Sequence, residues 1–177
     1  KGYEAITKQN RISKDGLRSV SNDHMLYYQR IHPSIEQESL LEYAVDKQSG
    51  DLQVSEAYRI PKFWTEAEHF EADFYAREIR SAVPKPSEIK RNAPWEFEYP
   101  NNIKHQIQLE FKSENWDFDA EEFTEDNAYF FFKMTQAFEN DILTVIYDYQ
   151  AKTDHIAADK IDDYLAARNR MREESYL

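Results

Sequence analysis

The strongest constraint on the fold is the alternation of side chains over residues 103–111, in which His105 is the one polar residue at the apolar positions. Ile103, Ile107 and Phe111 fall in phase on one side of this pattern, whereas lysine, glutamine and glutamate fill the other. Because successive side chains of a β-strand point to opposite faces, this spacing predicts a strand with one buried and one solvated face. Such half-buried strands are typical of antiparallel sheets.

Three neighbouring segments predict further strands. Residues 95–99 alternate aromatic side chains with glutamate, and residues 142–150 place leucine, valine and two tyrosines on one face. Residues 127–136 carry four consecutive aromatic side chains and are apolar on both faces, which favours a central strand. The 12 Tyr and 11 Phe residues of the chain suit pleated, half-buried surfaces of this kind.

The first half of the chain has weaker periodicity. Residues 40–46 and 51–60 predict a hairpin, since turn-forming residues separate two alternating segments. Residues 66–83 fit a strand that runs into a short helix, and residues 1–9 fit a short strand. The proline-rich segment 84–94 predicts a loop at which the chain changes sheets.

Helices are expected near both ends. Residues 19–32 place apolar side chains three and four positions apart, and Pro33 ends the pattern. Residues 157–174 show the same spacing, with aspartates early and arginines late, which complements the dipole of a helix.

These elements predict a mostly β protein of the α+β class. We expect an antiparallel β-sandwich of about seven or eight strands, with an N-terminal helix and a C-terminal helix. Residues 19–177 are assigned to this helix-flanked domain, and residues 1–18 to a strand or linker from a preceding region. The chain opens on Lys1 instead of methionine, so we interpret it as a fragment or a processed product.

Composition excludes several classes of function. The formal net charge of −12 makes nucleic acid and anionic membrane surfaces poor partners. The absence of cysteine excludes disulfides, thiolate metal sites and thiol nucleophiles within this chain. No apolar run approaches the roughly 18 residues of a membrane span, so membrane insertion is not expected. No cofactor is predicted.

The acidic segment 117–126 is the first candidate for a metal site, because calcium prefers carboxylate oxygens. It departs from the EF-hand pattern: the sixth position holds Glu122 where glycine is required, and the twelfth holds Ala128 where glutamate is required. We therefore interpret the segment as a solvated loop between strands.

Other catalytic arrangements have little support. No serine lies in a G-x-S-x-G turn, and 34 acidic residues make chance carboxylate pairs unspecific. The basic residues Lys85, Lys90 and Arg91 are assigned to a solvated loop or a clamp on acidic neighbours. No two histidines have the spacing of a shared metal site; they are His24, His32, His69, His105 and His155.

Tryptophan supplies the tentative contact residues. Trp95 belongs to an alternating strand and is assigned to the core. Trp64 and Trp116 fall at strand ends or in loops, so we keep them as candidates for surface contact with a sugar or a peptide.

Several segments together resemble the region that follows the transglutaminase-like core in large bacterial proteins. They contain turn prolines, strand aromatics and an arginine before a proline, and they cover residues 55–64, 70–76, 85–94, 99–100, 115–117 and 147–155. The resemblance extends over roughly residue 19 to the end. Those proteins combine a papain-like core with β-rich domains of unknown function and are regarded as exported cysteine proteases or cross-linkers.

The resemblance implies a non-catalytic accessory domain of a periplasmic or extracellular protein. The catalytic Cys, His and Asp of the family belong to its core, and none of them can be placed on this chain. The implied partner is the transglutaminase-like core of the same polypeptide, with a protein or glycan as a further partner. The alternative is a carbohydrate- or cell-wall-binding β-sandwich module, and an independent carboxylate enzyme ranks third.

Overall fold

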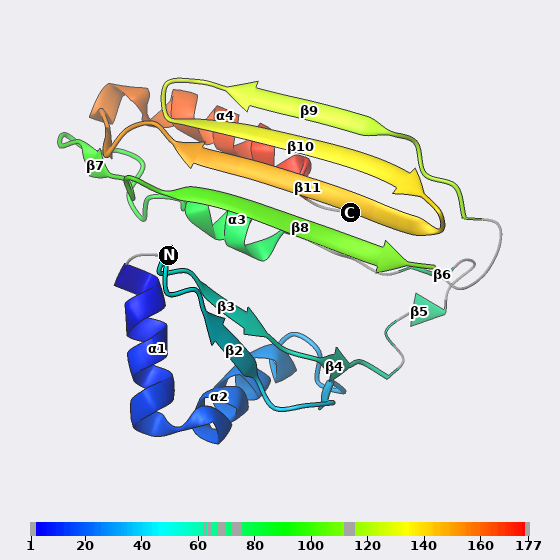
Figure 1. The fold of residues 1–177 in the computed structure, drawn as a ribbon. Helices are drawn as coiled ribbons and strands as arrows, with labels where there is room; N and C mark the ends of the chain where they lie inside the picture. Colours follow the sequence, from blue (N-terminus) through cyan, green and yellow to red (C-terminus); the bar gives the residue numbers. More distant parts are fainter. Residues whose placement is uncertain are drawn as a thin grey trace. The chain divides into compact units, whose positions relative to one another are not determined.

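The structure is a computed structural model that describes residues 3–61, 63, 65–66, 70–71, 76–111 and 116–175. The chain forms two compact units, Lys1–Ala72 and Asp73–Leu177. Both contain helices and antiparallel strands, and no sheet of the described residues closes into a barrel (Figure 1). The mixed α+β class, the antiparallel sheets and the helices near both ends are thereby confirmed.

The first unit combines two helices with three short antiparallel strand pairs. These pairs are β1 with β4, β2 with β3, and β5 with β6. The elements are α1 (Tyr3–Asp15), α2 (Leu17–Gln29), β1 (Glu36–Gln37), β2 (Glu42–Val45), β3 (Leu52–Ser55), β4 (Tyr58–Arg59), β5 (Thr65–Glu66) and β6 (Phe70–Glu71).

The strand predicted over residues 1–9 is wrong, because this segment belongs to α1. Ala5 and Ile12 are both buried and lie seven residues apart, which places them on one helical face. Ile12 packs in a small cluster with Val20 of α2 and Leu41. The linker at Gly16 adopts a φ of 83°, a conformation that glycine tolerates and that lets the chain turn between the helices.

The hairpin of the first unit is confirmed, although its second strand is shorter than predicted. In β2 and β3, Tyr43 pairs with Val54. The connecting turn is held by the carboxylate of Asp46, which accepts the backbone N–H groups of Gln48 and Ser49 at 2.8 and 3.3 Å. These hydrogen bonds lower the pKa of Asp46, since they favour the charged carboxylate.

The second unit is built on a four-stranded antiparallel sheet in the order β8-β11-β10-β9. The predicted strands at residues 103–111, 127–136 and 142–150 correspond to three of its members. The elements are α3 (Arg77–Ala82), β7 (Trp95–Glu96), β8 (Asn102–Glu110), β9 (Glu121–Asp126), β10 (Phe130–Glu139), β11 (Ile142–Ala151), β12 (His155–Ile156), the 3₁₀ turn η1 (Ala158–Lys160) and α4 (Ile161–Glu173).

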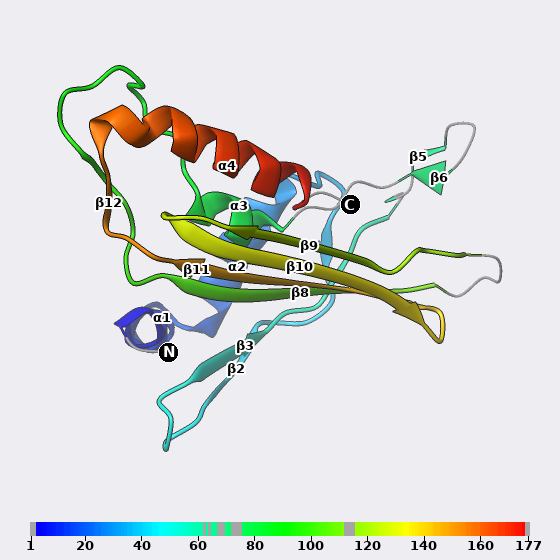
Figure 2. The same ribbon diagram turned by 90° about the horizontal axis from the view of Figure 1, so that it is seen from above.

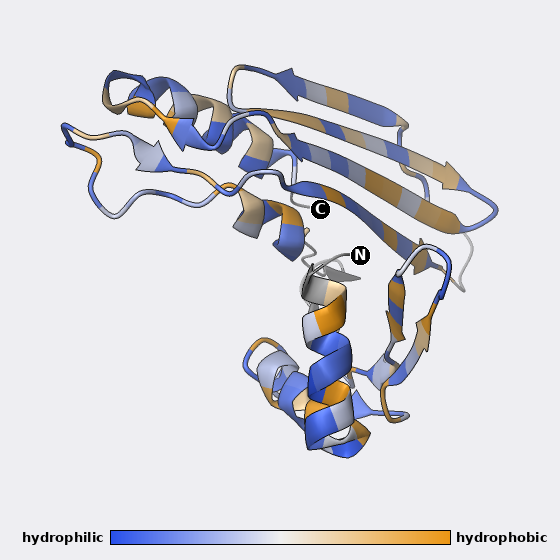
Figure 3. Cartoon of the chain, turned by 60° about the vertical axis from the view of Figure 1, so that its left-hand side comes forward, coloured by the Kyte–Doolittle hydropathy of each residue, from blue (hydrophilic) through white to orange (hydrophobic). Residues whose placement is uncertain are grey.

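Alternation along these strands produces one apolar face and one polar face, seen as bands of orange and blue in Figure 3. The register brings Phe132, Tyr149 and Ile103 into one row across three strands. Helices α3 and α4 cover this apolar face from the same side (Figure 2). Among the described residues the layer opposite the sheet is therefore helical, so the sandwich prediction is confirmed only in its antiparallel and helix-flanked part.

The acidic segment was predicted to be a loop, but residues 121–126 form the edge strand β9. Phe123 pairs with Met134 and packs on the core. The neighbouring Glu125 is half-buried and accepts two hydrogen bonds of 2.8 Å from Arg170 of α4. This pairing lowers the pKa of Glu125 and lets an acidic sequence lie against the helix layer.

Side chains along one face of α4 donate hydrogen bonds to backbone carbonyls at the end of α3 and in the loop that follows. The Tyr164 hydroxyl donates to the carbonyl of Pro84 at 2.7 Å, and Arg168 Nε donates to the carbonyl of Val83 at 2.8 Å. One turn further on, Arg172 Nη1 lies 3.4 Å from the carbonyl of Arg80. These contacts satisfy carbonyls that lack partners at a helix C-terminus.

None of the helices in the described part of the chain has the length and apolar composition needed to cross a membrane.

Candidate functional site

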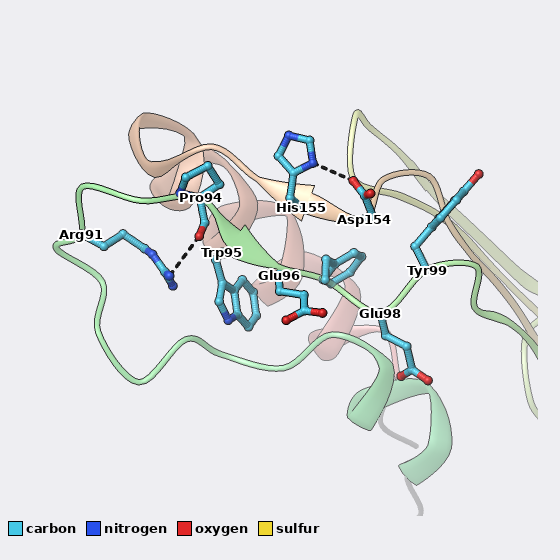
Figure 4. Close-up of a pocket in the computed structure, with 9 residues that line it drawn as sticks. Arg91, Pro94, Trp95, Glu96, Glu98, Tyr99, Asp154 and His155 are labelled. Carbon is cyan, nitrogen blue, oxygen red and sulfur yellow. Dashed lines mark hydrogen bonds and ion pairs between the residues drawn. The ribbon is translucent and has the colours of Figure 1, made fainter.

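A pocket lies where the short strand β7 pairs with β12 in the second unit (Figure 4). Its cavity volume is about 1070 Å³ and it is open to solvent. The residues around it come from the loop before β7, from β7 and the segment after it, and from the start of β12. They are Arg91, Pro94, Trp95, Glu96, Phe97, Glu98, Tyr99, Asp154 and His155.

Core packing holds one side of this strand in place. The Trp95 ring lies 5.5 Å from the ring of Tyr164 of α4, in an edge-to-face arrangement. Phe97 is buried against the same tyrosine, and its N–H donates to the carbonyl of Asp154 at 2.7 Å. Because these aromatic residues are anchored, the alternate residues Glu96 and Glu98 are directed to solvent.

The pocket is negatively charged. Its lining contains three carboxylates, those of Glu96, Glu98 and Asp154, and one guanidinium, that of Arg91. The Arg91 guanidinium donates to two backbone carbonyls, at 2.7 and 3.1 Å, and not to any of these acids. Tyr99 adds an aromatic ring that is 55% exposed. An open pocket with excess carboxylates and an exposed ring suits a cationic group.

His155 and Asp154 are hydrogen-bonded, with Nδ1 and Oδ1 2.6 Å apart. The hydrogen bond to His155 lowers the pKa of Asp154, since it favours the carboxylate. A histidine–aspartate pair is part of the serine hydrolase machinery, but these side chains are 61% and 73% exposed. The nearby hydroxyl of Thr153 donates to the carbonyl of His155, at 2.9 Å, instead of to the imidazole. The geometry is that of an exposed hydrogen bond between neighbouring side chains.

Of the two predicted contact residues, Trp116 alone belongs to the described part of the chain. Trp116 is half-buried and its ring lies 4.7 Å from that of Phe111 and 6.0 Å from that of Phe118, with which it stacks. Trp64 lies outside the described residues. The prediction that these two residues contact a sugar or a peptide therefore stays untested.

The histidines occupy separate environments. His24 pairs with Glu56, and His32 lies 5.8 Å, ring to ring, from Phe63. His69 falls outside the described residues. No group of three or more His, Asp or Glu side chains in the described ranges is arranged to hold a metal ion.

His105 lies on the core face of β8, where it pairs with Tyr147. Burial lowers its pKa, and Glu78 of α3 partly opposes this effect. The unfolded chain thus takes up a proton before the folded chain as the pH falls through about 6.5. We expect the free energy of unfolding to fall between pH 7.5 and pH 5, and His105→Phe to reduce this slope in urea titrations. An equal slope in both proteins would contradict the assignment.

Sequence reasoning did not identify the residues around this pocket as a site. Glu96, Glu98 and Tyr99 were read only as members of a strand, and the pair at 154–155 had no assigned role. The available signal was the alternation of glutamate with aromatic residues over 95–99. The basic segment that contains Arg91 was predicted to be a solvated loop or a clamp on acidic neighbours. Arg91 lies in a loop, and its guanidinium donates to the backbone carbonyls of Ala93 and Pro94 and not to an acid.

Comparison of the chain with protein-family models, with curated protein sequences and with solved structures finds no match.

Proposed function

We propose that this chain is a non-catalytic accessory module that mediates protein interaction, and that the pocket beside β7 and β12 binds a lysine- or arginine-bearing segment of a partner protein. The observation that carries this proposal is the composition of the lining: Glu96, Glu98 and Asp154 contribute carboxylates to an open pocket that also includes the exposed Tyr99.

The charge of the whole chain supports the same partner chemistry. A net charge of −12 attracts a cationic segment from a distance and raises the rate of encounter. Within the pocket, an ammonium or guanidinium group would pair with the exposed carboxylates, and its alkyl stem would lie along aromatic surface. The open shape suits an extended peptide better than a small apolar ligand, which usually requires an enclosed cavity.

Neutralising the carboxylates tests this role. We expect Glu96→Gln with Glu98→Gln to weaken binding of a fluorescent lysine- and arginine-rich peptide about three- to tenfold, since exposed ion pairs each contribute modestly. Fluorescence anisotropy at low salt measures the effect. The control is Glu139→Gln, an exposed glutamate at the far end of β10, which should bind as the unmodified chain does. Equal binding by all three proteins would exclude this pocket as the site.

The parent protein is a separate part of the proposal. The resemblance suggests an exported, periplasmic or extracellular transglutaminase-like protein whose catalytic core packs against this module. Sequencing the full gene product would test this directly, because a Cys/His/Asp core should precede Lys1. The non-catalytic role fails if the isolated chain hydrolyses or cross-links a peptide or ester probe faster than heat-denatured chain.

The alternative of a glycan-binding β-sandwich rests on Trp64 and Trp116. Trp116 is half-buried among phenylalanines, which leaves less of its ring for stacking on sugar. Binding of cell-wall glycan that is lost in Trp116→Ala but kept in Glu96→Gln would favour this alternative over the proposed peptide pocket.

A further inference from the structure

The four-stranded sheet of the second unit has two edge strands, β8 and β9, which lie on opposite sides of it (Figure 1). Edge strands leave backbone N–H and C=O groups unpaired, so another strand can add to them. β9 carries carboxylates at residues 121, 122, 125 and 126, and Glu125 is held by Arg170 of α4. Two copies of β9 would bring like charges together, and this edge is therefore protected against pairing.

β8 is the longer and more regular edge. It has nine residues, contains no proline, and pairs with β11 from Asn102 to Glu110 without a bulge. On its core face Ile103 and Ile107 are only half-buried, whereas Val145 of the neighbouring β11 is fully buried. Apolar surface therefore remains at this edge for a further strand to cover.

Hydrogen bonds at the two ends of β8 show which of its backbone groups point away from β11. Phe111 donates its N–H to the carbonyl of Asp141 at 2.9 Å. At the other end, Ala151 donates to the carbonyl of Asn101 at 2.8 Å. Because backbone groups alternate between the two sides of a strand, the odd-numbered residues of β8 face β11 and the even-numbered residues face outward. Among the described residues, no other strand pairs with these outward groups.

These directions restrict how two β8 strands can pair. Outward residues must lie opposite one another in an antiparallel pair, so a two-fold axis passes through a residue of β8 and not between two residues. With the axis at Ile107, Lys104 of each copy lies opposite Glu110 of the other. In the same register Gln106 lies opposite Gln108, and Ile107 lies opposite its own copy on the apolar face.

The two charges at the ends of this register are not used within the chain. Among the described residues neither Lys104 nor Glu110 forms an ion pair, although Lys104 lies opposite Asp148 of β11. An antiparallel copy of β8 supplies the opposite charge to both side chains, twice by symmetry. The edge is thus complementary to itself in charge, in backbone direction and in its apolar residues.

We propose that β8 pairs with β8 of a second copy of this chain, in the antiparallel register centred on Ile107, so that the two four-stranded sheets become one continuous sheet. The inference does not rest on the peptide pocket, which lies at β7 and β12. Because the contact is one strand and its flanks, and each chain has a net charge of −12, we expect a weak, reversible dimer.

The first test is sedimentation equilibrium of the 177-residue chain at concentrations up to about 0.5 mM. Salt at about 0.15 M screens the repulsion between two acidic chains beyond about 8 Å. We expect a monomer–dimer equilibrium. A monomer over the whole concentration range overturns the proposal.

Charge exchange tests the register. Glu110→Lys places a lysine opposite Lys104 of the other copy and is expected to weaken dimerisation about tenfold, because attraction becomes repulsion at two symmetric pairs. Within the chain, residue 110 lies opposite Ile142, so the substitution breaks no ion pair of the folded chain. The matched control is Glu139→Lys, which changes the net charge equally at an exposed position of β10 and should not weaken the dimer. Unchanged or stronger dimerisation of Glu110→Lys overturns the proposal.

The double variant Glu110→Lys with Lys104→Glu restores opposite charges in exchanged positions. We expect it to dimerise more tightly than Glu110→Lys alone, with the recovery limited by repulsion between the new glutamate and Asp148 of β11. An affinity no better than that of Glu110→Lys would contradict the register centred on Ile107.

Cysteine cross-linking reads the register independently, and it decides if the charge variants fail to fold. The chain has no cysteine of its own, so only introduced thiols react. In the proposed register, residues 106 and 108 of the two copies lie opposite each other at about 5.5 Å between Cα atoms, within disulfide range. A mixture of Gln106→Cys and Gln108→Cys chains should form a disulfide-linked dimer in an oxidised glutathione buffer. Faster cross-linking of either variant alone than of the mixture overturns the proposal.

Discussion

Replacing Tyr164 with alanine is expected to destabilise the second unit by about 3–5 kcal/mol, as for other large aromatic side chains removed from a core. Tyr164 is fully buried, and its ring makes edge contacts with those of Trp95, Phe97 and Tyr129. Its hydroxyl holds the carbonyl of Pro84. The substitution therefore removes the contacts that Tyr164 of α4 makes with β7 and with the loop that begins at Pro84.

Urea unfolding followed by circular dichroism measures this loss. The matched control is Tyr164→Phe, which keeps the ring and removes only the hydrogen bond, and which should cost about 1 kcal/mol. Tryptophan fluorescence of Tyr164→Ala should also change, since Trp95 packs on this ring. If alanine costs no more than phenylalanine at this position, the ring is not the anchor of the pocket.

The second large effect is expected in the first unit. Leu41 is 1% exposed and packs with Ile12 and Val20, the buried members of a small cluster. Leu41→Ala should cost about 2–5 kcal/mol. Because a small unit with a small core is only marginally stable, we expect this loss to unfold residues 3–61 while the second unit, with its larger core, stays folded.

Hydrogen exchange distinguishes local from global unfolding. Amides of α1 and α2 should exchange rapidly in Leu41→Ala, and those of β10 and β11 should keep their protection. The neighbouring Leu40 is 42% exposed, so Leu40→Ala provides a control of the same chemistry at the adjacent position. Loss of protection in both units would show that they unfold as one.

Side-chain periodicity predicted the strands that alternate over many residues. β8 and β11 have nine and ten residues with one buried face, and α4 carries a clear helical stripe. Periodicity does not predict which layer covers a sheet, because the same apolar face can pack against a helix or against a second sheet. For this reason the sequence led to a sandwich, whereas α3 and α4 cover the sheet.

Long-range partners explain the remaining differences. Glu125 appeared to belong to a solvated loop because its partner, Arg170, is 45 residues further along the chain. Residues 95–99 were expected to form a strand of the sheet, but only Trp95 and Glu96 pair, and their partners are His155 and Ile156. The pocket lies at this pairing, and the local alternation over residues 95–99 does not predict the distant partner strand. Residues 1–9 were predicted to form a strand, whereas the buried face of α1 joins Ala5 to Ile12, which lies beyond that segment.

The most direct test of the proposed peptide pocket is an NMR titration of the ¹⁵N-labelled chain with a lysine-bearing peptide and, separately, with a peptide of the same length that carries glutamate. We expect the lysine peptide to shift backbone signals of residues 95–99 and 154–155, and the glutamate peptide to leave them unchanged. Saturable shifts confined to β8 or to the first unit, or identical responses to the two peptides, would contradict it.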